Sequence, residues 1–263
     1  MKIFVFKART LGFAAAALIL TILLAVLTVV IFTSGTISVF GTDKDLPIYS
    51  VDLSEKKVAI TFDCAWGADD IPDILGTLER EGIKATFFIV GQWAEKYPEA
   101  VKMIAEKGHD VANHGYSHLR MGALDKGKLK SEILDCSKVL NELTGNDINL
   151  MRPPYGDYSN QVIATARELG YYTIQWDVDS LDWKPGISQQ EITNRVVQKV
   201  KTGSVILFHN DTPHTAKVLP SIIQYLKNDG YGFLPVSGMI LRENYYIDFE
   251  GRQKPKDKEF KQN

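Results

Sequence analysis

Residues able to perform acid–base or metal chemistry stand at the ends of five predicted β-strands. They are Asp63 and Cys64, Asn113 and His114 with His118 close behind, Arg152, the carboxylates Asp177, Asp179 and Asp182, and His209. Three of the chain's five histidines belong to this set. A single strand that ends in a charged residue is unremarkable, but five of them indicate a common site.

The stretch "NHGYSH" indicates metal binding. The i, i+4 spacing of His114 and His118 lets both imidazoles reach one ion from a single turn or tight loop. Two histidines leave a zinc site one protein ligand short. Cys64 or its neighbour Asp63 could supply that ligand, so one of the two faces the ion and the other a reacting water.

The segments that carry these residues alternate between strand-like and helical patterns. Val58, Ile60 and Phe62 alternate with smaller residues, as in a strand. The stretch 126–145 repeats apolar residues every three or four positions, as in an amphipathic helix. About seven such units predict an α/β fold with a parallel sheet, closed or nearly closed into a barrel. Functional residues of such barrels ring the mouth at the strands' carboxyl ends.

The ends of the chain are predicted to lie outside this domain. Leu11 to Phe32 is a run of 22 almost wholly apolar residues, long enough to span a bilayer. Positive residues precede it and none follows before Lys44, so we expect a cytoplasmic tip (1–9), a transmembrane helix (10–33) and an extracytoplasmic remainder. A cleaved signal peptide is the alternative, but the run is long and lacks a clear cleavage site. Residues 34–55 are predicted to form a stalk, and 242–263 a polar, frayed tail.

Composition excludes several classes of protein. The net charge of −2 and the lack of a basic stripe argue against a nucleic-acid partner. No G-x-G-x-x-G or P-loop motif is present, which argues against a nucleotide site. Two cysteines are too few for a disulfide scaffold, and Cys136 is predicted to pack in the core from its helix's apolar stripe.

Five stretches resemble a known family in their order. "TFDC", "HGYSH", "RPPYG", "DSLDW" and "ILFH" are similar to the five motifs of the NodB-type polysaccharide deacetylases, carbohydrate esterase family 4, over about residues 56–241. The resemblance implies a distorted (β/α)7-8 barrel that removes acetyl groups from glycans with a divalent metal, Zn²⁺. The anchor and "TFDCAWGADD" resemble the sporulation-associated PdaB subgroup, which implies N-acetylated amino sugars of cell-wall peptidoglycan as substrate.

The same resemblance implies a role for individual residues. Asp63 matches the general base, Arg152 the residue that orients it, and His209 the general acid tuned by Asp182. The metal ligands match His114, His118 and the position of Cys64. The substrate-binding positions match Tyr155 through its backbone amide, Trp183 as a wall of the groove, and Leu207 in the acetyl pocket.

Two positions depart from the family pattern. Gly115 replaces the usual Ser or Thr after the first motif histidine, and Cys64 replaces the metal-binding Asp. Cys64 has three possible roles: a thiolate ligand, a small buried filler that leaves metal binding weak or absent, or a nucleophile. Asp69 or Asp70 could supply the missing ligand. If Cys64 is a filler, the alternative function is a catalytically silent protein that binds wall glycan.

Overall fold

The computed structural model describes residues 18–25 and 44–256. Residues 18–25 form a helical segment of one unit, and a second, compact unit begins at Asp45. The predicted tip (1–9) and most of the predicted span (10–33) lie outside the described residues. Within the described ranges, no helix combines the length and the apolar character needed to cross a bilayer.

The second unit is built around a parallel sheet. Its strands are β2 (Lys57–Cys64), β3 (Thr86–Ile89), β4 (Asp110–Asn113), β5 (Leu150–Met151), β6 (Tyr172–Thr173), β7 (Val178–Asp179), β8 (Val205–His209) and β9 (Gly232–Phe233). The strand order is β6-β5-β4-β3-β2-β8-β7, and β9 pairs with the start of β2. The sheet curves into a half-barrel. Because its strands are parallel, their carboxyl ends all lie on one side of it.

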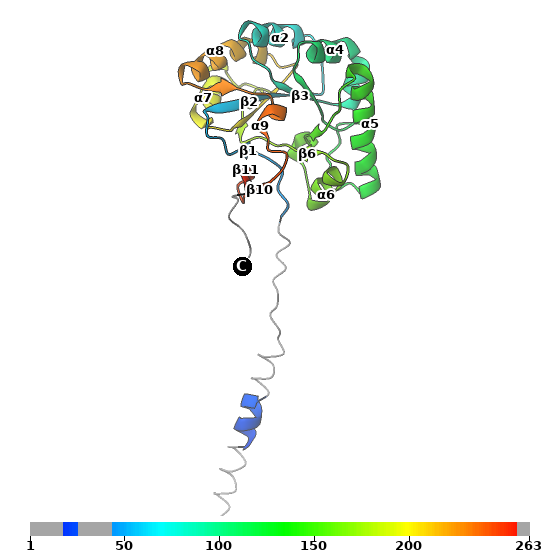
Figure 1. Ribbon diagram of the computed structural model, residues 1–263, viewed down its shortest axis with the longest axis vertical. Helices are drawn as coiled ribbons and strands as arrows, with labels where there is room; N and C mark the ends of the chain where they lie inside the picture. Colours follow the sequence, from blue (N-terminus) through cyan, green and yellow to red (C-terminus); the bar gives the residue numbers. More distant parts are fainter. Residues whose placement is uncertain (1–17, 26–43, 257–263) are drawn as a thin grey trace, which may run out of the picture. The chain divides into compact units, whose positions relative to one another are not determined.

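Helices cover the outside of the half-barrel (Figure 1). They are α2 (Ile71–Arg80), α3 (Gly91–Lys96), α4 (Pro98–Glu106), α5 (Lys126–Thr144), α6 (Asn160–Glu168), α7 (Gln189–Lys199) and α8 (Thr215–Asn228). The short α9 (Val236–Met239) packs instead in a cluster with Ala59 of β2. The sequence sets their ends. Asp125 caps α5 by accepting from the amide of Lys128, and Gly145 closes it in the left-handed conformation. Ser188 and Glu191 form a capping box on α7.

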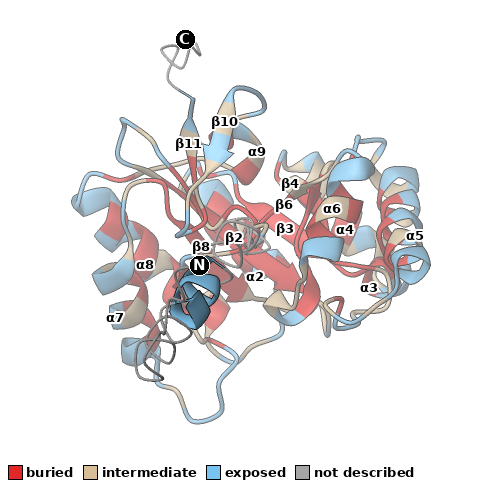
Figure 2. Cartoon of the chain, turned by 90° about the horizontal axis from the view of Figure 1, so that it is seen from below, coloured by how far each residue is buried: buried red, intermediate tan, exposed pale blue. Residues whose placement is uncertain are grey.

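The two faces of β2 belong to different cores. Val58, Ile60 and Phe62 point outward into the large apolar cluster beneath the helices. Ala59 packs into a smaller inner cluster, and Asp63 lies on the same side of the strand because side chains alternate with a period of two. Burial is accordingly concentrated in the strands and the inner faces of the helices (Figure 2). This alternation determines which residues reach the site.

The sheet does not close into a full barrel. The stretch "YTIQWDVD", which the pattern predicts to be one strand, is split into β6 and β7, and these form the two opposite edges of the sheet. Between them the chain crosses the gap, where Ile174 bridges Ile48 and the amide of Asp177 donates to Val205 O. The predicted barrel is thus observed as a half-barrel with a bridged opening.

Both chain ends of this unit are part of the fold, which corrects the predicted stalk and tail. β1 (Ser50–Val51) pairs with β11 (Arg252–Pro255), and β11 pairs with β10 (Tyr245–Ile247). Gly203 permits this small sheet to lie close to the barrel, since a Cβ there would stand 1.7 Å from Val51 O. Residues 45–55 are therefore not a stalk, and 245–255 are not frayed.

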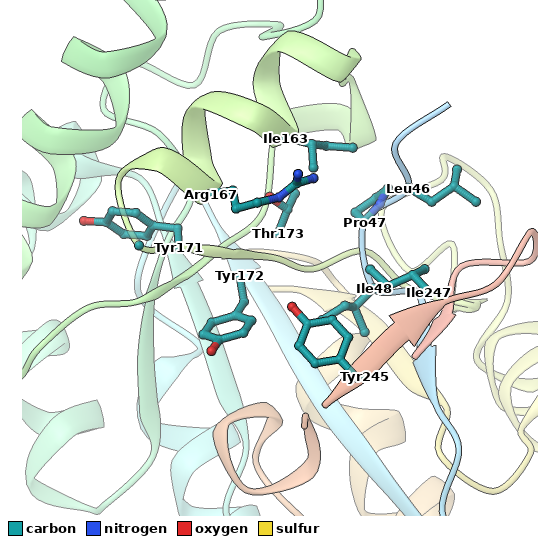
Figure 3. Close-up of a pocket in the computed structure, with 11 residues that line it drawn as sticks. Leu46, Pro47, Ile48, Ile163, Arg167, Tyr171, Tyr172, Thr173, Tyr245 and Ile247 are labelled. Carbon is teal, nitrogen blue, oxygen red and sulfur yellow. The ribbon is translucent and has the colours of Figure 1, made fainter. Parts of the chain in front are cut away.

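The same terminal segments border a hollow of about 220 Å³ (Figure 3). Ile163 and Arg167 of α6 line one side, and Tyr245 of β10 lines another, next to residues 46–48. Arg167 also forms an ion pair with Asp45 at 3.2 Å. The N-terminal entry and the C-terminal hairpin thus pack together along the edge of the half-barrel that β6 forms.

Candidate active site

The carboxyl ends of the strands surround a cleft of about 640 Å³. It is lined by Asp63, Trp66, His114, His118, Arg120, Tyr155, Trp176, Asp179, Trp183, Leu207, His209, Asn210, Asp211, Thr212 and Pro213. Most of the predicted site residues are therefore brought together. Arg152 and Asp182 are buried directly behind the lining, each bonded to a residue of the cleft.

Asp63 and Arg152 form a buried ion pair. Arg152 Nη1 donates to Asp63 Oδ1 at 2.6 Å, and Nη2 donates to Gln175 O at 3.1 Å. Burial alone would raise the pKa of Asp63, but the charge of Arg152 and the hydrogen bond that it donates, together with the charge of His209, outweigh burial and lower that pKa. Asp63 is therefore an ionised carboxylate at neutral pH, and its Oδ2 lies 3.5 Å from Nε2 of His114, which also lines the cleft.

His209 is paired with Asp182 at the end of β8, directly opposite Asp63 in the register of β2 and β8. His209 Nδ1 lies 2.8 Å from Asp182 Oδ1, and the backbone amide of His209 donates to Oδ2 at 2.7 Å. Thr215 Oγ1 donates to the same oxygen at 2.6 Å. Burial tends to lower the pKa of His209, but the hydrogen bond and charge of Asp182 raise it overall. The imidazole is thus suited to hold a proton and donate it from Nε2.

The two histidines of the second motif meet at the end of β4. His114 Nδ1 lies 2.8 Å from the carbonyl oxygen of Arg152, which can only accept, so Nδ1 carries the proton and Nε2 keeps a free lone pair. The ring centroids of His114 and His118 are 5.2 Å apart. Burial lowers the pKa of His118 to about 4, so its ring is neutral at pH 7.

Tyr155 lies beside these histidines. Its ring centroid is 4.6 Å from that of His118. Its backbone has φ 61° and ψ 11°, a left-handed conformation that non-glycine residues rarely adopt. Such strain is typical of functional sites. The two prolines before Tyr155 fix their own φ angles and so stiffen the loop after Arg152.

Cys64 is not brought to the cleft. Cys64 points outward from β2, on the same face as Phe62, and is fully buried in the apolar cluster under the helices. It does not line the cleft. Burial, reinforced by the charges of Asp63 and Asp70, raises the pKa of its thiol well above the ordinary value. The predicted metal ligation by Cys64 therefore has no support in this geometry, and neither does a nucleophilic thiolate.

The remaining carboxylates divide between structure and cleft. Asp177 accepts from Ser204 Oγ and from the amide of Val205, and it does not line the cleft. Asp179 lines the cleft and also accepts from the amide of Leu181. Asp70, the alternative ligand, accepts from the amide of Asp211 instead of facing the histidines.

Comparison with known proteins agrees with this arrangement. A family model described as polysaccharide deacetylase matches residues 50–174. A peptidoglycan-N-acetylglucosamine deacetylase of Bacillus cereus is 37% identical over 196 residues, which cover 73% of this chain and 70% of that protein. The chain belongs to the polysaccharide deacetylase family.

Relatives in this family include active and inactive proteins. The peptidoglycan-N-acetylmuramic acid deacetylase PdaA of Bacillus subtilis is 26% identical, with 74% of this chain and 75% of PdaA covered. The structure of BA3943, a family 4 pseudoenzyme of Bacillus anthracis, is similar with a TM-score of 0.71 and 30% identity, covering 73% of this chain and 68% of that one. A mutant of BA3943 with restored enzymatic activity gives the same TM-score at 31% identity, covering 73% and 70%.

The divalent metal that the deacetylase family implies can be tested against the donor atoms present. His114 and His118 offer two neutral imidazoles, as a metal requires. A third ligand is missing, because Cys64 faces the apolar cluster and Asp63 is held by Arg152. Among the described residues, no three His, Cys, Asp or Glu side chains are placed to hold an ion. The residues do not fit the complete site, so we derive no step through a metal.

Two residues outside the motifs, Glu132 and Asn113, hold the loop that carries the histidines of the site. Glu132 of α5 accepts from the amides of Tyr116 and Ser117 at 3.0 and 2.7 Å, which fixes the loop between the two histidines. Asn113 Oδ1 accepts from the amide of Gly115 at 2.8 Å. In the sequence, Glu132 could have been noticed as a single acidic residue on the apolar stripe of its helix. The departure at Gly115 is explained by its φ of 73°, which favours glycine.

The cleft walls include Trp183 and Leu207, as predicted, and also Trp66. Trp183 is exposed at the rim, and Leu207 is buried at the floor. Trp66 is exposed and stands edge-on to His118, with ring centroids 5.5 Å apart. Aromatic side chains in the cleft wall provide apolar surfaces on which a sugar ring could stack.

Proposed function

We propose that this family member hydrolyses N-acetyl groups from amino sugars of cell-wall peptidoglycan. The observation that carries the proposal is the pair of dyads that meet in one cleft, on the adjacent strands β2 and β8. Asp63 with Arg152 supplies an ionised base, and His209 with Asp182 supplies an acid whose pKa is raised. Two groups whose environments shift their pKa values in opposite directions are typical of general acid–base catalysis. The similarity to peptidoglycan deacetylases supports the substrate class.

The residues account for the proton transfers of this reaction. Oδ2 of Asp63, the oxygen not bonded to Arg152, accepts a proton from water as the water oxygen attacks the acetyl carbonyl carbon. The tetrahedral intermediate collapses when the C–N bond breaks, and His209 Nε2 donates its proton to the departing amine nitrogen. The products are acetate and a free amino sugar. The backbone amide of Tyr155 is the candidate donor to the oxyanion, a contribution of ~2.7–4 kcal/mol in comparable sites.

The place of action is proposed from the sequence. The apolar run at 10–33 and the charges on either side of it support a single-pass anchor with the deacetylase domain outside the membrane. The resemblance of "TFDCAWGADD" to the sporulation-associated PdaB subgroup supports a role in spore formation.

A second function is favoured by one observation, the position of Cys64. With that residue in the apolar cluster, the metal site is incomplete, and a catalytically silent protein could still bind glycan in the aromatic cleft. The similarity to a pseudoenzyme supports this alternative. It differs from the first in one measurable respect, since it requires binding without turnover.

Acetate release from acetylated peptidoglycan strands by the full chain separates the two functions. A deacetylase should release acetate, and Asp63→Ala should lower the rate by about 10²–10⁴-fold, as expected for loss of a general base. Asp73→Ala is the matched control, because Asp73 is an exposed acid on α2. Absence of acetate together with glycan binding that survives Asp63→Ala would favour the silent protein.

Metal analysis of Cys64→Asp and Cys64→Ser then locates the defect. If Cys64 is only packing, Cys64→Ser should leave the metal content of the chain unchanged. A simultaneous gain of bound zinc and of acetate release in Cys64→Asp would identify the missing carboxylate as the reason for weak or absent activity. Loss of metal in Cys64→Ser would instead show that the thiol is a ligand.

A further inference from the structure

The cleft contains a cation that the hydrolytic steps do not use. Arg120 follows His118 by two residues, and its side chain is exposed and lines the cleft. It is the only lysine or arginine among the described residues that form the lining. Arg152, the other arginine of the site, lies buried behind the lining and is occupied by Asp63.

Arg120 is held in place by the aromatic ring beside the reacting centre. Its guanidinium carbon lies 4.6 Å from the centroid of the Tyr155 ring, in cation–π geometry. The amide of Gly122 donates to Asp157 Oδ2 at 2.9 Å, which ties the loop of Arg120 to the loop of Tyr155. Arg120 therefore lies near the histidines, on a loop that is fixed by its contacts with the neighbouring loop.

The polar atoms of Arg120 have no partner in the described part of the chain. No hydrogen bond or ion pair reaches its guanidinium group there, so its N–H donors face solvent or a bound ligand. Arg242 shows the contrast. It lies 4.8 Å over the Tyr172 ring but also donates to Asn149 Oδ1 at 3.2 Å and to Ser237 O at 3.4 Å.

The acidic residues of the cleft are all engaged with other groups. Asp63 accepts from Arg152, Asp179 from the amide of Leu181, and Asp211 from the amide of Gly67. The guanidinium group of Arg120 is thus available to an anion that arrives with the substrate. A planar carboxylate matches its fork of donors.

We propose that Arg120 selects glycans that carry a carboxylate at a muramic acid residue. The inference rests on the proposed function and narrows its substrate. In muramic acid the lactyl ether is attached to C3, next to the C2 that bears the acetamido group. Asp63, His209 and Arg120 line the same cleft, so with the acetamido group at Asp63 and His209 the lactyl arm can direct a carboxylate to Arg120. Neutral N-acetylglucosamine chains offer no such partner.

The carboxylate has two possible sources. It is the lactyl group itself where the stem peptide has been removed, or it belongs to the peptide where the lactyl carboxyl is amide-linked. Three tetrasaccharide probes distinguish them. The first is neutral tetra-N-acetylglucosamine, the second an alternating glucosamine–muramic tetramer with free lactyl carboxylates, and the third the same alternating tetramer carrying stem peptides.

Calorimetric binding of these probes to the full chain tests the proposal. Arg120→Gln should weaken binding of the carboxylated probes by about tenfold and leave the neutral tetramer unchanged, as expected for loss of one charge-assisted contact. Arg242→Gln is the matched control, with the same charge change at a stacked arginine outside the cleft. The probe with the larger loss identifies the source of the carboxylate. Thermal melting checks that each variant is folded.

The outcomes separate this proposal from the proposed function. Equal binding of the carboxylated probes by wild type and Arg120→Gln overturns the role of Arg120 and leaves glycan deacetylation standing. Failure of the wild-type chain to bind any of the three probes overturns both. Arg120→Lys keeps the charge but loses the planar fork, so partial retention of the preference would support bidentate recognition.

Discussion

At the scale of single residues, the site depends on two charge pairs that act in opposite directions. The guanidinium group of Arg152 keeps Asp63 ionised despite its burial. The carboxylate of Asp182 raises the pKa of His209, although burial opposes the charged form of the imidazole. Neither property belongs to the isolated residue, because in water an Asp and a His would titrate near their ordinary values.

Asp182→Asn is expected to lower the pKa of His209. Burial is the largest influence on that imidazole and lowers its pKa, so after loss of the Asp182 charge only the charges of Asp63 and Asp179 oppose burial. The raised pKa of the wild type means that the pair stabilises the fold at low pH and that this stabilisation is lost as pH rises through that pKa. In the variant, His209 should lose its proton at a lower pH than in the wild type.

An NMR titration of the His209 imidazole measures this shift without requiring turnover. If acetate release is detected, the alkaline limb of its pH profile should move to lower pH as well. Asp135→Asn, a change at an exposed acid of α5, should leave the titration unchanged. An unchanged His209 titration in Asp182→Asn would contradict the assignment of His209 as the tuned acid.

At the scale of elements, strand alternation and one helix decide which residues reach the cleft. The alternation along β2 sends Asp63 toward the cleft and Cys64 toward the helices. The loop after β4 is held by α5, because the Glu132 carboxylate accepts from two successive amides of that loop. Burial tends to raise the pKa of Glu132, but the hydrogen bonds from Ser117 and the charge of Lys128 lower it overall.

Glu132→Gln is expected to loosen the loop between His114 and His118. The variant keeps the size of the side chain but loses the charge and one acceptor, which should lower the free energy of unfolding by about 2 kcal/mol. Hydrogen exchange at the amides of Tyr116 and Ser117 should accelerate, and glycan affinity should fall. Glu142→Gln, an exposed position on the same helix, serves as the control. Unchanged exchange at both amides would show that Glu132 does not organise the loop.

At the scale of the whole molecule, the two terminal segments complete the half-barrel. Gln253 of β11 is fully buried, where its side chain accepts from the amide of Leu241 at 2.8 Å and donates to the carbonyl oxygen of Leu241 at 2.9 Å. Its backbone carbonyl accepts from the amide of Asp52. One residue therefore ties the C-terminal hairpin to both the domain body and the N-terminal entry.

Gln253→Ala is expected to destabilise the chain by about 2 kcal/mol, because the amide and carbonyl of Leu241 lose their buried partners. For a domain of this size, the melting temperature should fall by about 4–8 °C. Lys256→Ala is the control, since that side chain is exposed just beyond β11. A melting temperature equal to that of the wild type would show that β10 and β11 are peripheral to the fold.

The sequence by itself determined the alternating units, the ordered motifs and the residues of the two dyads. Each is a local pattern: periodicity marks strands and helices, and polar residues after apolar strands mark one edge of a parallel sheet. Asp63, Arg152 and His209 therefore could be predicted to meet, although not which groups would shift their pKa values.

Only the tertiary structure decided that Cys64 faces the core, that the barrel is not closed, and that the terminal segments pair with each other. Side-chain direction at a strand end depends on the packing of both faces, so adjacent residues 63 and 64 could not be separated by motif alone. The pairing of β1 with β11 joins Ser50 to Arg252, 202 residues further along the chain, and the position of Arg120 over Tyr155 joins two different loops. Such contacts are set by the assembled fold, and no periodic signal in the sequence encodes them.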